Sequence, residues 1–118
     1  MENESIAFTE YIYKERFKEM SQLKENPKGN RIIVSIMGPD RVGIISGVTG
    51  VLSANNVNIL DISQTTLQEF LVMVLVADME KSKVDLATLK ELLNAKGKVI
   101  GVRIDAQHED VFNFMHRI

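Results

Sequence analysis

The sequence predicts an α+β domain in which two helices cover one face of a four-stranded antiparallel sheet. Apolar runs of strand length alternate with helical patterns in the order strand, helix, strand, strand, helix, strand. Only Gln68-Glu69 separates the second strand from the third, which favours a hairpin. The third strand, residues 70–77, is apolar on both faces and is therefore expected in the centre of the sheet. This order of elements is the ferredoxin-like βαββαβ arrangement.

Composition is that of an ordinary soluble domain. The 118 residues fit one domain with a substantial core, and 45% are hydrophobic while 25% are charged. The net charge of −2 leaves no basic surface for nucleic acid or an anionic membrane. Cysteine is absent, which excludes disulfides, thiolate metal sites and a catalytic thiol. No apolar run is long enough to span a bilayer, and the acidic N-terminus does not resemble a secretion signal, so we expect a cytoplasmic protein.

Residues 1–30 are expected to form an arm and linker that are separate from the domain at residues 31–118. Residues 1–25 have the pattern of a helix with one apolar face, formed by Ile6, Tyr13, Phe17 and Met20. Pro27 and Gly29 then end the helix. Two interpretations stay open: the arm packs on its own subunit or on a partner, or translation begins at Met20 and the arm is not present.

The first half of the domain is predicted as follows. Residues 32–37 form the first strand, and residues 41–55 form a helix with Asp40 as its N-cap. Asn55-Asn56 ends this helix, and residues 57–67 form the second strand. That strand is unusually polar, because Asp61, Ser63 and Thr65 share one face at a period of two. The polar face is either solvated, or part of a subunit interface, or one wall of a ligand site.

The second half is predicted to begin with a helix at residues 83–95, capped by Ser82 and stopped by Gly97. Residues 98–106 form the fourth strand, and residues 109–118 form a short amphipathic helix. In the fourth strand the apolar side chains alternate with Gly101, Arg103 and Asp105, so one face of the sheet is expected not to be core. A sheet with one uncovered face often gains cover from a second subunit.

The loop that joins the first strand to the first helix has the features of an anion site. Residues 38–44 form a polar turn bracketed by glycine, and free backbone N–H groups gather where a helix begins. A carboxylate could bind to these N–H groups while Asp40 receives an ammonium group, and a free amino acid offers both. The alternative for Asp40 and Arg41 is a helix cap and a solvated charge.

A line of small residues marks one face of the first helix, namely Gly43, Gly47, Gly50 and Ala54. Interior glycines cost about 1 kcal/mol each relative to alanine, so a compensating role is expected. We predict close backbone packing at Gly47 and Gly50, and either packing or ligand access at Gly43.

The sequence contains no candidate catalytic or metal-binding constellation. His108 and His116 are eight residues apart without a third ligand at a recognised spacing, and no serine nucleophile or paired carboxylates stand out. We therefore expect no enzymatic activity, no cofactor and no metal. An RNA-binding module of this topology would display stacking aromatics, whereas Phe70 is the only aromatic residue on the predicted central strands. An acyl-phosphate hydrolase would need an arginine-bearing phosphate loop that is not recognisable here, and a metal chaperone would need a cysteine pair.

The loop at residues 38–44 (GPDRVGI), followed by Val57-Asn58-Ile59, resembles the ACT domain, a small-molecule-sensing module of amino-acid metabolism. The runs at residues 58–65 and 112–118 narrow the resemblance to small stand-alone ACT proteins of bacteria and archaea, related to the glycine-cleavage repressor group. The resemblance covers residues 31–118, whereas residues 1–30 depart from it.

The resemblance implies a dimer with sheets joined side by side and a ligand at the subunit interface. One chain would supply Asp40, Arg41, Val42, Gly43 and Ile44, and the other would supply Asn58 and Ile59. The leading hypothesis is a non-catalytic regulatory module that senses an amino acid or a related metabolite. The alternative is a structural or protein-interaction module without a ligand, in which the dimer and the arm bind a protein partner.

Overall fold

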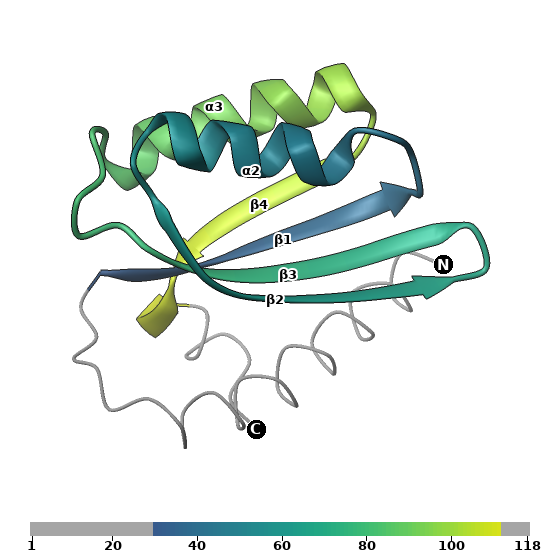
Figure 1. Ribbon diagram of the computed structural model, residues 1–118, viewed down its shortest axis with the longest axis horizontal. Coiled ribbons are helices and arrows are strands. Elements are labelled where there is room, and N and C mark those ends of the chain that lie inside the picture. The colour runs from purple at the N-terminus through teal and green to yellow at the C-terminus, as the bar shows by residue number, and fades with distance from the viewer. Residues whose placement is uncertain (1–29, 112–118) are drawn as a thin grey trace.

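The computed structural model describes residues 30–111 of the chain, and these residues form the predicted βαββαβ fold. Both helices lie on one face of a four-stranded antiparallel sheet (Figure 1). The predicted helix at residues 1–25 lies outside the described residues. So does most of the predicted C-terminal helix, of which only the helical residues 109–111 are described. The elements are β1 (Arg31–Pro39), α2 (Ile44–Ala54), β2 (Asn58–Leu67), β3 (Phe70–Asp78), α3 (Leu86–Ile100) and β4 (Arg103–His108).

The sheet has the strand order β2-β3-β1-β4, so β3 and β1 are central and β2 and β4 are the edges. The prediction that the third strand is central is confirmed, because β3 is buried along nearly its whole length. β2 and β3 form the predicted hairpin, with Gln68 in the left-handed region at φ 59°. The register between them shifts between Ile59 and Asp61, so Leu60 forms a bulge in the edge strand.

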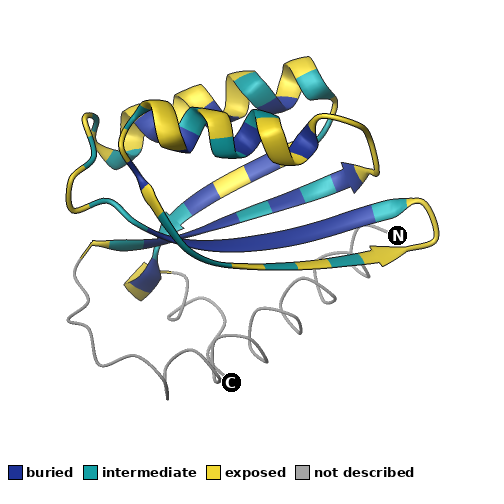
Figure 2. Cartoon of the chain, in the orientation of Figure 1, coloured by how far each residue is buried: buried dark blue, intermediate teal, exposed yellow. Residues whose placement is uncertain are grey.

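The main core lies between the sheet and the two helices, and Figure 2 colours buried residues dark blue on both helices and along the central strands. Alternate residues of β1 and β3 point into this layer, while α2 and α3 each contribute positions three or four residues apart. Its largest fully buried members are Ile32, Ile36, Ile44, Leu52, Leu71, Met73, Leu75, Leu89 and Leu93.

The face of the sheet opposite the helices is only partly polar, which differs from the prediction that this face is not core. The polar second face predicted from the fourth strand is present in β4, where Arg103 and Asp105 are exposed. It does not extend to the central strands, where a second apolar cluster is buried. We call this cluster the second-face stripe; it consists of Ile33, Val72, Val74 and Val76, with Met37, Leu60 and Phe70 packed against it. A fourth strand at the edge could not reveal the pattern of the central strands.

The first helix begins later than predicted, at Ile44 instead of Arg41. Gly43 is the N-cap with a left-handed φ of 93°, so the residues before it cannot continue the helix. The prediction that Asp40 is the N-cap is therefore wrong. The backbone N–H of Asp40 instead donates to the carbonyl oxygen of Glu69 at 2.9 Å, which ties the loop to the β2–β3 hairpin. The predicted end at Asn55-Asn56 is confirmed.

The second helix is shifted toward the C-terminus relative to its prediction. Its N-cap is Asp85, whose carboxylate accepts from the Thr88 N–H at 2.9 Å, whereas Ser82 only closes a local turn with Val84. Gly97 lies inside α3 and Gly101, at φ 93°, ends it. Residues 98–100 are consequently helical, which makes the predicted fourth strand too long at its start.

Candidate ligand-binding site

The loop between β1 and α2 presents an uncapped helix N-terminus. No described side chain caps α2, and its first turn contains no acidic residue. The first N–H groups of an α-helix lack intrahelical partners, so this end is available to an anion. Gly43 stands in open space, because a Cβ added there would meet nothing within 4 Å. Val42 beside it is fully exposed.

Two of the predicted loop residues have structural roles. Ile44 is only 1% exposed and packs in the main core, so its side chain is not available to a ligand. The guanidinium group of Arg41 lies against Gly101, where an added Cβ would be 3.3 Å from Arg41 Cζ. Gly101 is the C-cap of α3, and a cation at the C-terminus of a helix is favourable. Asp40, Val42 and Gly43 are therefore the loop residues whose positions suit ligand contact.

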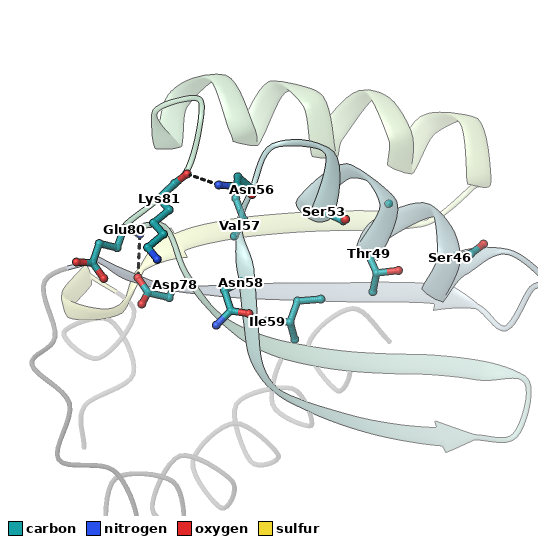
Figure 3. Close-up of a pocket in the computed structure, with 11 residues that line it drawn as sticks. Ser46, Thr49, Ser53, Asn56, Val57, Asn58, Ile59, Asp78, Glu80 and Lys81 are labelled. Carbon is teal, nitrogen blue, oxygen red and sulfur yellow. Dashed lines mark hydrogen bonds between the residues drawn. The ribbon is translucent and has the colours of Figure 1, made fainter.

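A groove of about 890 Å³ runs between α2 and β2 and continues past the end of β3 (Figure 3). Asn58 and Ile59, predicted from the sequence, line this groove on its β2 side. The side chains of α2 that face it are small or carry hydroxyl groups, and both charge signs occur at one end. The further lining residues are Ser46, Thr49, Gly50, Ser53, Asn56, Val57, Asp78, Glu80 and Lys81.

The polar groups of the groove are partly held by local hydrogen bonds. Thr49 Oγ1 donates to the Ile45 carbonyl oxygen at 2.7 Å, which leaves its lone pairs for a donor. At the charged end, Asn56 Nδ2 donates to the Lys81 carbonyl oxygen at 3.1 Å, and Asp78 Oδ1 accepts from the Glu80 N–H at 2.9 Å. The Asn56–Lys81 bond holds the turn after β3 beside the start of β2, so the end of the groove is built by two connections 25 residues apart.

The predicted site residues are not brought together within one chain. The loop at residues 40–44 lies at the N-terminus of α2, whereas Asn58 and Ile59 follow its C-terminus. The 11 residues of α2 place these two ends about 16 Å apart. Each half therefore faces a different end of the helix layer.

The two edges of the sheet differ in how open they are. β2 is ten residues long, contains no Lys, Arg or Pro, and exposes Ile62 and Leu67. β4 is six residues long and carries the exposed ion pair Arg103–Asp105, with 3.1 Å between Nε and Oδ2. Charged side chains and short length protect an edge from pairing, so within residues 30–111 β2 is the less protected edge, although it carries Asp61 and the bulge at Leu60.

Most residues that line the groove were not predicted from the sequence as ligand-binding residues. Ser46, Thr49, Gly50 and Ser53 recur at i, i+3, i+4 and i+7, and this small polar face of the helix was a usable signal. Gly50 was predicted to be in close packing, but a Cβ there would meet nothing within 4 Å. At Gly47 the prediction is confirmed, because a Cβ would lie 2.6 Å from Ile100 Cδ1. No sequence signal marked the residues after β3.

Residues 30–111 contain no helix that is long and apolar enough to cross a membrane. Across the same residues, no three His, Cys, Asp or Glu side chains gather as metal ligands would.

A family model and several curated relatives match this chain over the same part of its sequence. Residues 30–107 match the model of the ACT domain, a regulatory ligand-binding module. The UPF0237 protein of Methanocaldococcus jannaschii is 48% identical over 89 residues, which cover 75% of this chain and 99% of the relative. A UPF0237 protein of Clostridium perfringens is 44% identical over 73% of this chain and 97% of its own length.

Solved structures of ACT domain proteins have the same fold as this chain. An ACT domain protein from Streptococcus pneumoniae superposes with a TM-score of 0.64 at 33% identity, over 72% of this chain and 96% of that one. A putative glycine cleavage system transcriptional repressor shares the fold at 15% identity, with a TM-score of 0.59 over 66% of this chain and 44% of its own. The chain belongs to the ACT domain family and groups with the small UPF0237 proteins of archaea and bacteria.

Proposed function

We propose that this protein is a non-catalytic regulatory module that binds an amino acid or a related metabolite between two copies of the chain. The observation that carries the proposal is the separation of the two halves of the site. The uncapped N-terminus of α2 and the groove beside Asn58 lie at opposite ends of the same helix, next to the less protected edge strand β2. Two copies can bring together what one chain keeps apart.

Antiparallel pairing of two β2 edges would assemble the site. The loop at residues 40–44 lies at the hairpin end of β2, because the Asp40 N–H bonds to Glu69. Asn58 lies at the other end of the same strand. When two antiparallel strands pair about a two-fold axis, the start of one meets the end of the other. Asn58 of one chain then approaches the loop of its partner, as the family resemblance implies.

The chemistry of the combined site suits a zwitterion. The free N–H groups at the start of α2 would bind a carboxylate, and the Asp40 carboxylate or the Asn58 side-chain oxygen would accept from an ammonium group. The open space beside Gly43 allows a ligand to reach the backbone.

The test combines a ligand panel with a disrupted edge. Ile62 is 40% exposed and lies near the middle of β2, so Ile62→Lys would set two like charges close together across the two-fold axis. Val99→Lys is the matched control, because Val99 is 82% exposed on α3. Sedimentation measures the oligomeric state, and calorimetry with the twenty amino acids and related metabolites measures binding.

We expect the unmodified protein and the Val99→Lys variant to be dimers that bind at least one member of the panel. The Ile62→Lys variant should be a monomer that binds none of them. A monomeric variant that still binds with unchanged affinity would place the site within one chain. Silence of the dimeric protein across the whole panel would contradict ligand sensing.

One observation favours the alternative of a protein-interaction module. The outer surface of the helix layer exposes Leu92 and Val99 in a shallow hollow of about 470 Å³ between α2 and α3. Exposed apolar patches are typical of surfaces that bind other proteins. Under this alternative Val99→Lys would abolish capture of a partner from the source cell, and the ligand panel would remain silent.

A further inference from the structure

The second-face stripe is buried on the side of the sheet that the helices do not cover. Ile33, Val72, Val74 and Val76 are each only 1–4% exposed. Both α2 and α3 lie on the opposite face, and no helix or strand within residues 30–111 covers the stripe (Figure 1). Four apolar side chains this deeply buried need a covering layer.

The shape of the stripe indicates a single helix as its cover. Its four buried members lie on the two central strands, only Leu60 of an edge strand packs against them, and polar residues flank the stripe on both edge strands. In one row across the sheet, Ser63 of β2 pairs with Val74, and Ser35 of β1 pairs with Asp105 of β4. Two strands span about 10 Å, which matches the diameter of an α-helix. A second sheet would need an apolar surface across all four strands.

We propose that residues 1–25 form this cover, docking as an amphipathic helix along the stripe of their own chain. Their predicted apolar face contains Ile6, Tyr13, Phe17 and Met20. At 1.5 Å per residue, such a helix would be about 37 Å long, enough to follow the roughly 30 Å of β1. A C-terminal helix over residues 109–118 would extend only about 15 Å, which is half the length of β1.

The short connection between the arm and β1 supports docking along the stripe. The Met79 N–H donates to the Asn30 carbonyl oxygen at 2.9 Å, so the chain enters the sheet beside the end of β3. Residues 26–30 contain Pro27 and Gly29, and a five-residue connection is typical between neighbouring elements. The chain would therefore reverse direction within this connection. The helix would lie antiparallel to β1, along β1 and β3.

The cover is an addition to the family module. The family model begins at residue 30, and 89 residues of this chain account for 99% of the length of the M. jannaschii relative. By occupying the second face, the arm would prevent two sheets from stacking face to face. The open β2 edge would then be the surface left for pairing, which makes this inference compatible with the proposed dimer but independent of it.

The first experiment uses the absence of cysteine, since a single introduced thiol then gives the whole signal. Val74→Cys places the thiol in the stripe, and its rate of labelling reports exposure. Phe17→Asp should raise that rate roughly tenfold or more, because a charge on the apolar face undocks the arm. Phe8→Asp is the matched control and should leave the rate unchanged, because Phe8 is nine residues away and on the opposite face of the helix. Leu75→Cys, which faces the main core, should stay unreactive in each background.

Three results of this experiment would overturn the proposal. The first is fast labelling of Val74→Cys in the chain with Phe17 intact. The second is slow labelling that persists with Phe17→Asp. The third is protection that disappears on dilution, which would identify a second copy as the cover.

A second experiment avoids disruptive substitutions, in case Phe17→Asp unfolds the chain and Leu75→Cys becomes reactive. Ser21 borders the apolar face of the arm, and Ser35 lies on the second face of β1. A short bis-maleimide should link Ser21→Cys to Ser35→Cys within one chain. It should not link Ser21→Cys to Ser46→Cys, because Ser46 is exposed on α2 across the sheet. Equal linking of both pairs, no linking, or links only between chains would contradict docking on the same chain.

Discussion

Gly97 offers a quantitative test of how α3 meets β4. The sequence favours a helix that stops at this glycine, but in the fold α3 continues through it to Ile100. A Cβ added at Gly97 would lie 2.7 Å from the Val102 carbonyl oxygen and 3.2 Å from Ile104 Cγ1. Glycine is therefore used here for close approach of the backbone and not for a helix end.

The magnitude follows from two opposing effects. Alanine in a helix interior is better than glycine by about 1 kcal/mol. Forcing extra volume into a packed site costs about 1–3 kcal/mol, and the obstacle is a backbone oxygen. The turn that carries this oxygen is held by the N–H groups of Gly101 and Val102, which both donate to the Gly97 carbonyl oxygen at 2.7 and 2.9 Å. We expect Gly97→Ala to lower the free energy of unfolding by about 1 kcal/mol.

Gly50→Ala is the matched control, because a Cβ at Gly50 meets nothing within 4 Å. It should raise the free energy of unfolding by up to about 1 kcal/mol, so the two variants should differ by about 2 kcal/mol. Urea unfolding followed by circular dichroism measures both values. Equal stabilisation by the two substitutions would refute the reasoning, since it would mean that the Val102 carbonyl group does not lie against Gly97.

Three further predictions concern single interactions. Gly101→Ala should lower the free energy of unfolding by about 1 kcal/mol, because alanine is strained at φ 93°; an unchanged urea midpoint would contradict this. Glu109 Oε1 accepts from Arg31 Nε at 3.1 Å and Oε2 lies 2.8 Å from Nη2, with side chains 4% and 15% exposed. Glu109→Leu alone should therefore cost about 3 kcal/mol, and Arg31→Met added to it should recover part of the loss in a double-mutant cycle. Hydrogen bonds from Thr88 lower the pKa of Asp85, so its stabilising effect is present above its unfolded pKa and is lost as the pH falls through its folded pKa. At neutral pH the melting temperature of the Asp85→Ala variant should be lower than that of the unmodified protein, and this difference should disappear below about pH 4. Equal melting temperatures at neutral pH would mean that the carboxylate has no capping role.

The sequence predicted the four strands and their order along the chain well, because strands are recognised from alternation and apolar runs among neighbouring residues. β3 is apolar on both faces, and its central position follows directly. The helix ends were less accurate, because they depend on which glycine adopts a left-handed φ. Gly43 and Gly101 adopt a left-handed φ, whereas Gly97 is helical. Gly97 differs from the other two by its close packing against β4, which the sequence does not reveal.

The candidate site shows a similar division. The loop at residues 38–44 is contiguous, so its glycines and polar residues mark it in the sequence. The groove is not contiguous, because its charged end joins Asn56 to Lys81 across 25 residues. No local pattern indicates that these two connections meet. Residues far apart in the chain can be assigned to one site only when the pairing of β2 with β3 is known.

A site shared by two chains would couple ligand binding to dimerisation with the same free energy in both directions. Ligand at 100 times its dissociation constant would stabilise the dimer by about 2.7 kcal/mol for each site that requires both chains. The dimer dissociation constant should therefore fall about 100-fold per site in sedimentation runs with ligand. A groove complete within one chain would leave that constant unchanged at any ligand concentration. The comparison separates the two arrangements even before a bound ligand is seen, because only the shared site uses the β2 edge and the α2 N-terminus together.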